Sequence, residues 1–130
     1  MNDFNFKIPQ DIIFGKGSLS RLPEVLKEAN CKKVLLVSDH GLEAVGVVAK
    51  VEKIITEAGL GYAQFLDLQP NPTIDNVNAA LEVYKSSGAE SIIALGGGGP
   101  MDVAKSVGLL ATYGGKVTDY AGFGKVPGPV

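Results

Sequence analysis

Apolar and polar positions along the chain alternate between segments typical of strands and segments typical of helices. Three short stretches rich in apolar residues are predicted to be strands of a parallel sheet, at Lys33–Ser38, Tyr62–Leu66 and Ser91–Leu95. Around them apolar residues recur every three or four positions, the period of an amphipathic helix, over Ser18–Asn30, Leu42–Ala58, Thr73–Ser87 and Pro100–Ala111. This alternation predicts an α/β fold wound by right-handed crossovers.

The residues before the first helix predict an N-terminal β-hairpin. Phe4–Ile8 alternates apolar and polar residues, and Asp11–Phe14 reads as a second short strand after a turn at Pro9-Gln10. At the other end, Val126–Val130 resembles the approach to a further strand. We therefore expect the chain to be cut rather than finished at that point.

Local signals fix several helix ends. Thr73 is expected to cap the helix that follows it. Gly59 and Gly88 are expected to end the helices that precede them. Pro23 is tolerated only near the start of a helix, so the first turn of that helix should be distorted.

Four glycines, Gly96–Gly99, lie between the third strand and the last helix. Glycines let backbone N–H groups approach a phosphate closely and tolerate positive φ. A helix N-terminus adds further donors and the positive end of its dipole. Pro100 suits the first helical position, which makes Gly99 the expected N-cap. A nucleotide or dinucleotide pyrophosphate is the first ligand to consider; the alternative is a turn with surplus glycine and no ligand.

The turn departs from the common G-x-G-x-x-G dinucleotide fingerprint. The third glycine of that pattern would fall at Met101, and the turn follows a late strand rather than the first. Asp102 is expected in the first helical turn, where it could be simply a capping acid. Lys105 could reach a phosphate, although we favour a solvated side chain.

Polar residues follow the other two strands. The carboxylate of Asp39 could accept hydrogen bonds from a ribose diol and would repel a 2′-phosphate, or it could be the N-terminal acid of the next helix. Asn71, held between two prolines, could bind a cofactor amide or sugar, or be a turn asparagine. His40 is interpreted as a loop residue. Because the carboxyl ends of parallel strands share one edge, these segments should converge with the glycine turn.

Composition narrows the function classes. The length of 130 residues suits one domain, and the net charge of −2 gives no electrostatic footprint for nucleic acid or an anionic membrane. No apolar run approaches the about 18 residues of a membrane span, and Met1–Phe4 does not resemble a signal peptide. The single cysteine, Cys31, excludes an internal disulfide and favours a cytoplasmic protein.

The chain has one histidine and one cysteine, too few for a His- or Cys-rich zinc or iron site. A carboxylate magnesium site stays possible, but no paired acidic motif indicates one. We therefore predict no catalytic and no metal-ligating residue within this sequence.

These residues together resemble a known family. Gly96–Lys105 is similar to the G-G-G-S-P-x-D-x-A-K signature of the iron-containing (group III) alcohol dehydrogenases, and Phe14–Leu19, Val37–Asp39 and Pro70–Thr73 also match that family's pattern. The resemblance covers essentially the whole chain. It implies a Rossmann-like three-layer domain with a mostly parallel sheet, the N-terminal dinucleotide-binding domain of the family, over residues 1–130. The family's all-helical C-terminal domain is absent from this sequence.

The resemblance also implies roles for individual residues. The NAD pyrophosphate would be held by the glycine turn and the start of the helix, namely Gly96, Gly97, Gly98, Gly99, Pro100, Met101 and Asp102. Asp39 would contact the adenosine ribose, and Asn71 would line the cofactor cleft. Iron or zinc would be bound by one Asp and three His of the missing helical domain. Gly99 replaces the family's serine, and losing one hydrogen bond of about 0.5–1.5 kcal/mol should weaken cofactor binding without abolishing it.

We therefore hypothesise that the chain is the NAD(H)-binding domain of a metal-dependent dehydrogenase that acts on a small alcohol or aldehyde. The 130-residue chain alone is expected to be inactive. One alternative is a relative such as glycerol dehydrogenase or 3-dehydroquinate synthase, against which Pro100-Met101-Asp102 favours the alcohol dehydrogenases. Another is a non-catalytic nucleotide-binding or interaction module. Apolar surface left by missing sheet partners could also make the chain a homo-oligomer.

Overall fold

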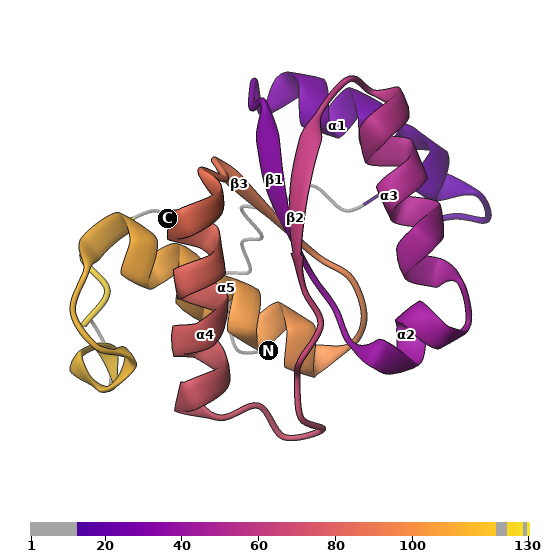
Figure 1. Cartoon of the computed structure of the whole chain (residues 1–130). Helices are drawn as coiled ribbons and strands as arrows, with labels where there is room; N and C mark the ends of the chain where they lie inside the picture. Colours follow the sequence, from indigo (N-terminus) through magenta and orange to yellow (C-terminus); the bar gives the residue numbers. More distant parts are fainter. Residues whose placement is uncertain (1–12, 122–124, 129) are drawn as a thin grey trace, which may run out of the picture.

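A computed structural model describes residues 13–121, 125–128 and 130 (Figure 1). The predicted hairpin falls on residues 4–14, almost all of which lie outside the described residues, and stays a prediction. No helix of the described part of the chain is long and apolar enough to cross a membrane.

The described sheet has three parallel strands, β1 (Lys33–Val37), β2 (Gly61–Phe65) and β3 (Ser91–Ala94), in the order β2-β1-β3. Leu35 of β1 lies opposite Ala63 of β2 and Ile92 of β3. The four residues Val34–Val37 are fully buried because β1 is the central strand and has helices on both faces.

Helices cover both faces of the sheet (Figure 1). One face carries the 3₁₀ helix η1 (Ser18–Arg21) and the helices α1 (Leu22–Glu28), α2 (His40–Ala44) and α3 (Val47–Glu57). The other face carries α4 (Ile74–Ser87) and α5 (Gly98–Tyr113), and a second 3₁₀ helix, η2 (Val117–Tyr120), follows α5.

The core is divided in the same way, because alternate residues of β1 point to opposite faces. Val34 and Leu36 pack with residues of α1 and α3, whereas Leu35 and Val37 pack with residues of α4 and α5. The predicted three-layer, Rossmann-like α/β arrangement is thus confirmed.

The predicted helix over Leu42–Ala58 is wrong as a single element. The chain forms α2 and α3 instead, separated at Val45-Gly46, where Gly46 has a φ of 86°. The apolar period continues through this break, but a positive φ cannot be part of a right-handed helix. Gly46 thus becomes the N-cap of α3.

The predicted start of α5 is also wrong. The N-cap is Gly97 rather than Gly99, and Pro100 is the third helical residue. None of the first N–H groups of a helix has an intrahelical acceptor, so proline fits anywhere in the first turn and does not mark its first position. Asp102 consequently lies beyond the first turn, not in it as expected.

Other local predictions are confirmed. Thr73 caps α4 in a reciprocal capping box with Asn76. Gly88 ends α4 in the left-handed region with a φ of 74°. The expected distortion before Pro23 takes the form of η1, which runs directly into α1.

Candidate functional site

The carboxyl ends of β1 and β3 lie side by side at a change in winding direction. After β1 the chain passes through α2 and α3 on one face, whereas after β3 it enters α5 on the other face (Figure 1). Such a switch point opens a crevice that binds ligands in open α/β sheets. The Ser38 hydroxyl, fully buried, donates to the Leu95 carbonyl over 2.8 Å and joins the two strand ends.

A cavity of about 480 Å³ lies at this edge. Its volume is within the about 300–1,000 Å³ range of small-molecule and cofactor sites. It is lined by residues that follow all three strands, namely Asp39, His40, Gly41, Leu68, Gln69, Pro70, Gly97, Gly99 and Pro100. The convergence predicted from sequence therefore brings Asp39 and part of the glycine turn together.

A somewhat larger cavity, about 550 Å³, lies between η1, α1 and α3. Its walls are mostly apolar, and its lining contains no residue that directly follows a strand. We assign the candidate site to the smaller cavity, because it lies at the carboxyl ends of the strands and is lined by both Asp39 and the N-terminal end of α5.

Position 96 requires glycine because of its backbone conformation and because of the atoms around it. Its φ is 134°, a conformation that L side chains rarely adopt. A Cβ there would also lie 3.0 Å from the Cγ of Pro100 and 3.2 Å from the Cδ1 of Leu42. Gly96 thus sets the path of the chain into the turn.

Gly97 and Gly98 are not required by packing. A Cβ on either would meet no atom within 4 Å, and on Gly99 it would make only an ordinary contact of 3.4 Å with Pro72. The N–H groups of Gly98 and Gly99 lie in the first turn of α5 and have no acceptor within the helix. Gly97, the N-cap, has no side chain to satisfy them. Open space beside bare donors is the geometry that a phosphate requires.

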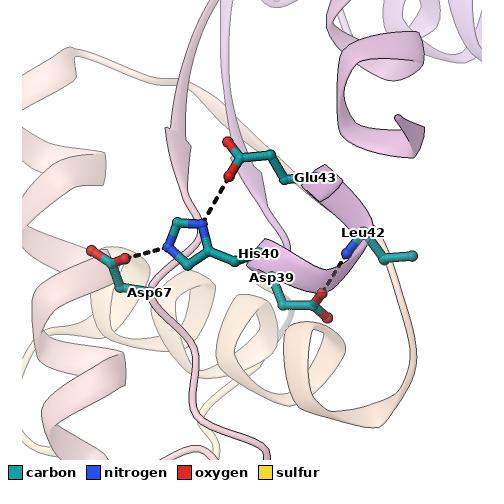
Figure 2. A network of polar contacts seen from close by, with 5 residues as sticks. All are labelled: Asp39, His40, Leu42, Glu43 and Asp67. Atoms are coloured by element: carbon teal, nitrogen blue, oxygen red, sulfur yellow. Dashed lines mark hydrogen bonds and ion pairs between the residues drawn. The ribbon is translucent and has the colours of Figure 1, made fainter. Parts of the chain in front are cut away.

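Asp39 has a structural role at the cavity. Its Oδ1 accepts a hydrogen bond from the N–H of Leu42 over 2.8 Å and caps α2 (Figure 2). This is the helix-terminal role considered as an alternative from the sequence. A carboxylate has about four acceptor sites on its two oxygens, so capping leaves capacity to bind a ligand.

Of the nine residues expected at the site, five are not part of the cavity lining: Gly96, Gly98, Asn71, Met101 and Asp102. Asn71 is exposed. Its neighbour Pro70 lines the cavity, and its other neighbour, Pro72, lies beside Gly99. Asp102 is exposed, and Met101, 44% exposed, lines a different cavity beside β3. The structure does not bring the side chains of Asn71, Met101 and Asp102 to the glycine turn's open side.

His40 was interpreted as a loop residue, which is wrong. It is the first residue of α2, with its Nδ1 2.9 Å from Glu43 Oε1 and its Nε2 2.6 Å from Asp67 Oδ1 (Figure 2). The hydrogen bonds with Glu43 and with Asp67 raise the pKa of His40 above its usual 6.5. Glu43 lies three positions along the helix and was visible in the sequence. Asp67, 27 positions away, was not.

Within the described residues, no group of three or more His, Cys, Asp or Glu side chains is placed to hold a metal ion. The prediction of no metal ligand concerns the whole sequence, including residues that the structure does not describe, and stays a prediction.

Comparison with known proteins gives a family match over nearly all of the chain. The model of the family described as iron-containing alcohol dehydrogenase matches residues 9–129. Alcohol dehydrogenase 4 of Saccharomyces cerevisiae is 42% identical over 117 residues, which are 90% of this chain and 31% of that protein. The NAD-dependent methanol dehydrogenase of Bacillus methanolicus is 37% identical over 126 residues, 97% of this chain and 33% of that protein.

Solved structures give the same result. A 1,3-propanediol oxidoreductase matches with a TM-score of 0.92 and 34% identity over 99% of this chain and 34% of its own. NADH-dependent butanol dehydrogenase A from Thermotoga maritima matches with a TM-score of 0.84 and 32% identity over 92% of this chain and 30% of its own. The chain spans about a third of the length of these relatives.

Proposed function

The chain belongs to the iron-containing alcohol dehydrogenase family, and we propose that residues 1–130 form an N-terminal dinucleotide-binding domain that holds NAD(H). The observation that carries this proposal is the open space at Gly97 and Gly98 beside the unpaired N–H groups at the start of α5. Two similar proteins, one named NAD-dependent and one NADH-dependent, support it.

In the proposed complex the pyrophosphate of NAD lies against the N–H groups of Gly97, Gly98 and Gly99, where the helix dipole favours an anion. Asp39 accepts hydrogen bonds from the adenosine ribose with the capacity that capping of α2 leaves. Gly96 and Pro100 shape the turn. Asn71 follows Pro70, which lines the cavity, and it is assigned to the cofactor cleft on the resemblance alone. Met101 and Asp102 belong to the proposed motif on the resemblance alone.

For the whole enzyme we propose hydride transfer between a small alcohol or aldehyde and the nicotinamide ring. NAD supplies the hydride acceptor, and an iron or zinc ion supplies a Lewis acid for the alcohol oxygen. We assign no metal ligand and no catalytic residue among the described residues. The contribution of this chain is to bind and orient the cofactor, and the 130-residue chain by itself is proposed to be inactive.

Two alternatives remain as outcomes of experiment. A glycerol dehydrogenase-like or 3-dehydroquinate synthase-like activity would use the same cofactor domain, but the family match favours alcohol dehydrogenases. A non-catalytic interaction module would lack cofactor binding, whereas a non-catalytic nucleotide-binding module would keep it. Homo-oligomerisation and a cytoplasmic location also stay proposals, which size-exclusion chromatography and fractionation of the native cells would test.

Isothermal titration calorimetry of the chain with NAD, NADH, ADP-ribose and nicotinamide mononucleotide tests the proposal. NAD and ADP-ribose should bind with millimolar or tighter Kd, because both carry the pyrophosphate and the adenosine ribose, and nicotinamide mononucleotide should bind much more weakly. No binding of NAD or ADP-ribose would refute the cofactor role. Alcohol oxidation by the purified chain with NAD and iron or zinc would refute its proposed inactivity.

A further inference from the structure

His40 connects two elements that both contribute to the cavity wall. Its Nδ1 faces Glu43 within α2, and its Nε2 faces Asp67 in the segment after β2 (Figure 2). His40 itself lines the cavity, as do Leu68 and Gln69 directly after Asp67. The side chain thus lies between the start of α2 and the loop that faces the glycine turn.

The loop is held at both of its ends. At its start, the Asp67 carbonyl accepts from the Asn76 side chain over 3.2 Å, while the Asp67 carboxylate meets His40. At its end, Pro72 lies beside Gly99, and Thr73 caps α4. The contact with His40 links this loop to α2 through side chains, and both elements line the cavity, so the contact bears on the cavity's shape.

The geometry around His40 favours the imidazolium form. Glu43 and Asp67 are both acceptors when ionised, and only a doubly protonated imidazole can donate at both ring nitrogens. A neutral ring keeps one hydrogen bond and turns a lone pair toward the other carboxylate. The charged groups that face His40 are Glu43 on its own helix and Asp67 on the neighbouring loop, with Asp39 adjacent in sequence.

We propose that His40 is a positioning residue of the cofactor site, whose protonated ring bridges α2 to the loop after β2 and thereby strengthens NAD binding. This inference rests on the proposed function. Protonation should tighten NAD binding about two- to fivefold, the range that the loss of one exposed ion pair allows. By linkage, NAD must raise the pKa of His40 in return.

Variants at Asp67 separate the bridge from general damage to the fold. In Asp67→Ala, NAD should bind at every pH as weakly as it binds to the wild type at high pH. In Asp67→Asn, the amide can accept from the charged ring and donate to the neutral one, so binding should be rescued and become nearly independent of pH. Glu82→Ala removes an exposed acid on α4, away from the cavity lining, and should keep the wild-type pH profile.

The test combines calorimetric NAD titrations between pH 5.5 and 9 (a range of about one pH unit or more around the usual histidine pKa) with NMR of the ring protons of His40, the single histidine of the chain. A Kd that weakens as the ring deprotonates, and a pKa of His40 that rises when NAD is added, would support the inference. If NAD binds with the same Kd across this range, or if Asp67→Ala keeps the wild-type profile, the inference is overturned while the proposed function stands. If NAD binds at no pH, both are overturned.

Discussion

Individual glycines of the turn have different roles, although the sequence presents them as equivalent. Gly96 is constrained by a φ of 134° and by Pro100 and Leu42, whereas Gly98 borders open space. Gly96→Ala should lower the free energy of unfolding by about 1–3 kcal/mol through backbone strain and crowding. Urea denaturation monitored by circular dichroism measures this loss.

Gly98→Ala is the matched control for that change. Alanine is the better helix former by up to about 1 kcal/mol, so the stability of Gly98→Ala should equal or exceed that of the wild type. Its Kd for NAD should nevertheless weaken, because the methyl group enters the space proposed for the pyrophosphate. Unchanged NAD affinity in a stably folded Gly98→Ala would contradict the assignment of this space to a ligand.

At Gly99, a substitution is expected to strengthen NAD binding rather than weaken it. A Cβ at this position would lie 3.4 Å from Pro72, an ordinary contact, and the signature that the turn resembles has serine there. Gly99→Ser should fold stably and lower the Kd for NAD by about two- to tenfold, because the hydroxyl adds a donor of about 0.5–1.5 kcal/mol near the phosphate. Gly99→Ala separates this hydrogen bond from the gain in helix propensity: it should stabilise the fold without strengthening NAD binding.

The raised pKa of His40 also predicts how stability depends on pH. A histidine whose pKa is higher in the folded than in the unfolded state contributes its full stabilisation below about pH 6.5. That contribution is lost as the pH rises through the folded-state pKa. The difference in Tm between the wild type and Asp67→Ala should therefore be largest near pH 5.5 and disappear at alkaline pH. A difference that grows with pH would show that the bridge does not favour the charged ring.

Local chemistry decided which site residues were predictable from the sequence. Thr73 caps a helix with partners three positions away, and Asp39 directly follows a recognisable strand, so both positions were inferred correctly. The bridging contact of His40 was not predicted, because its second partner, Asp67, is brought to it only by the pairing of β1 with β2. A solitary histidine gives no sequence signal for such a contact.

At the scale of elements, hydrophobic periodicity found the helices but not every helix boundary. Val45 and Val48 continue one apparent apolar period, yet Val45 is 72% exposed and Gly46 breaks the helix. The start of α5 was misplaced for a related reason, since four consecutive glycines carry no periodic information about where helical geometry begins.

Gly46 offers a test of that break. A Cβ there would meet no atom within 4 Å, so the cost of a side chain comes from its φ of 86° alone. Gly46→Ala should lower the free energy of unfolding by about 1–2 kcal/mol, and Gly46→Asn should lower it less because asparagine tolerates this region better. Denaturation of the three proteins provides the comparison. Equal stability of Gly46→Ala and wild type would mean that α2 and α3 can merge into one helix.

At the scale of the whole molecule, the sequence predicted a parallel α/β sheet but not the order of its strands. That order depends on which face of the sheet each connecting helix packs against, and helices of both faces carry similar apolar stripes. The order β2-β1-β3 matters for function because it creates the switch point between β1 and β3. The crevice is therefore a property of the assembled sheet, whereas its donors and its acid are local.

If that crevice binds NAD, the ligand must stabilise the entire fold. At a concentration 100 times the Kd, binding to the folded state adds about 2.7 kcal/mol, which for a domain of this size corresponds to a rise in Tm of about 10 °C. NADP at the same concentration should give a smaller rise, because its 2′-phosphate would approach the carboxylate of Asp39. Differential scanning fluorimetry with Asp39→Asn as a comparison measures both effects, since this amide still caps α2 but does not repel the phosphate. Equal responses of the wild type to NAD and NADP would place the adenosine ribose away from Asp39.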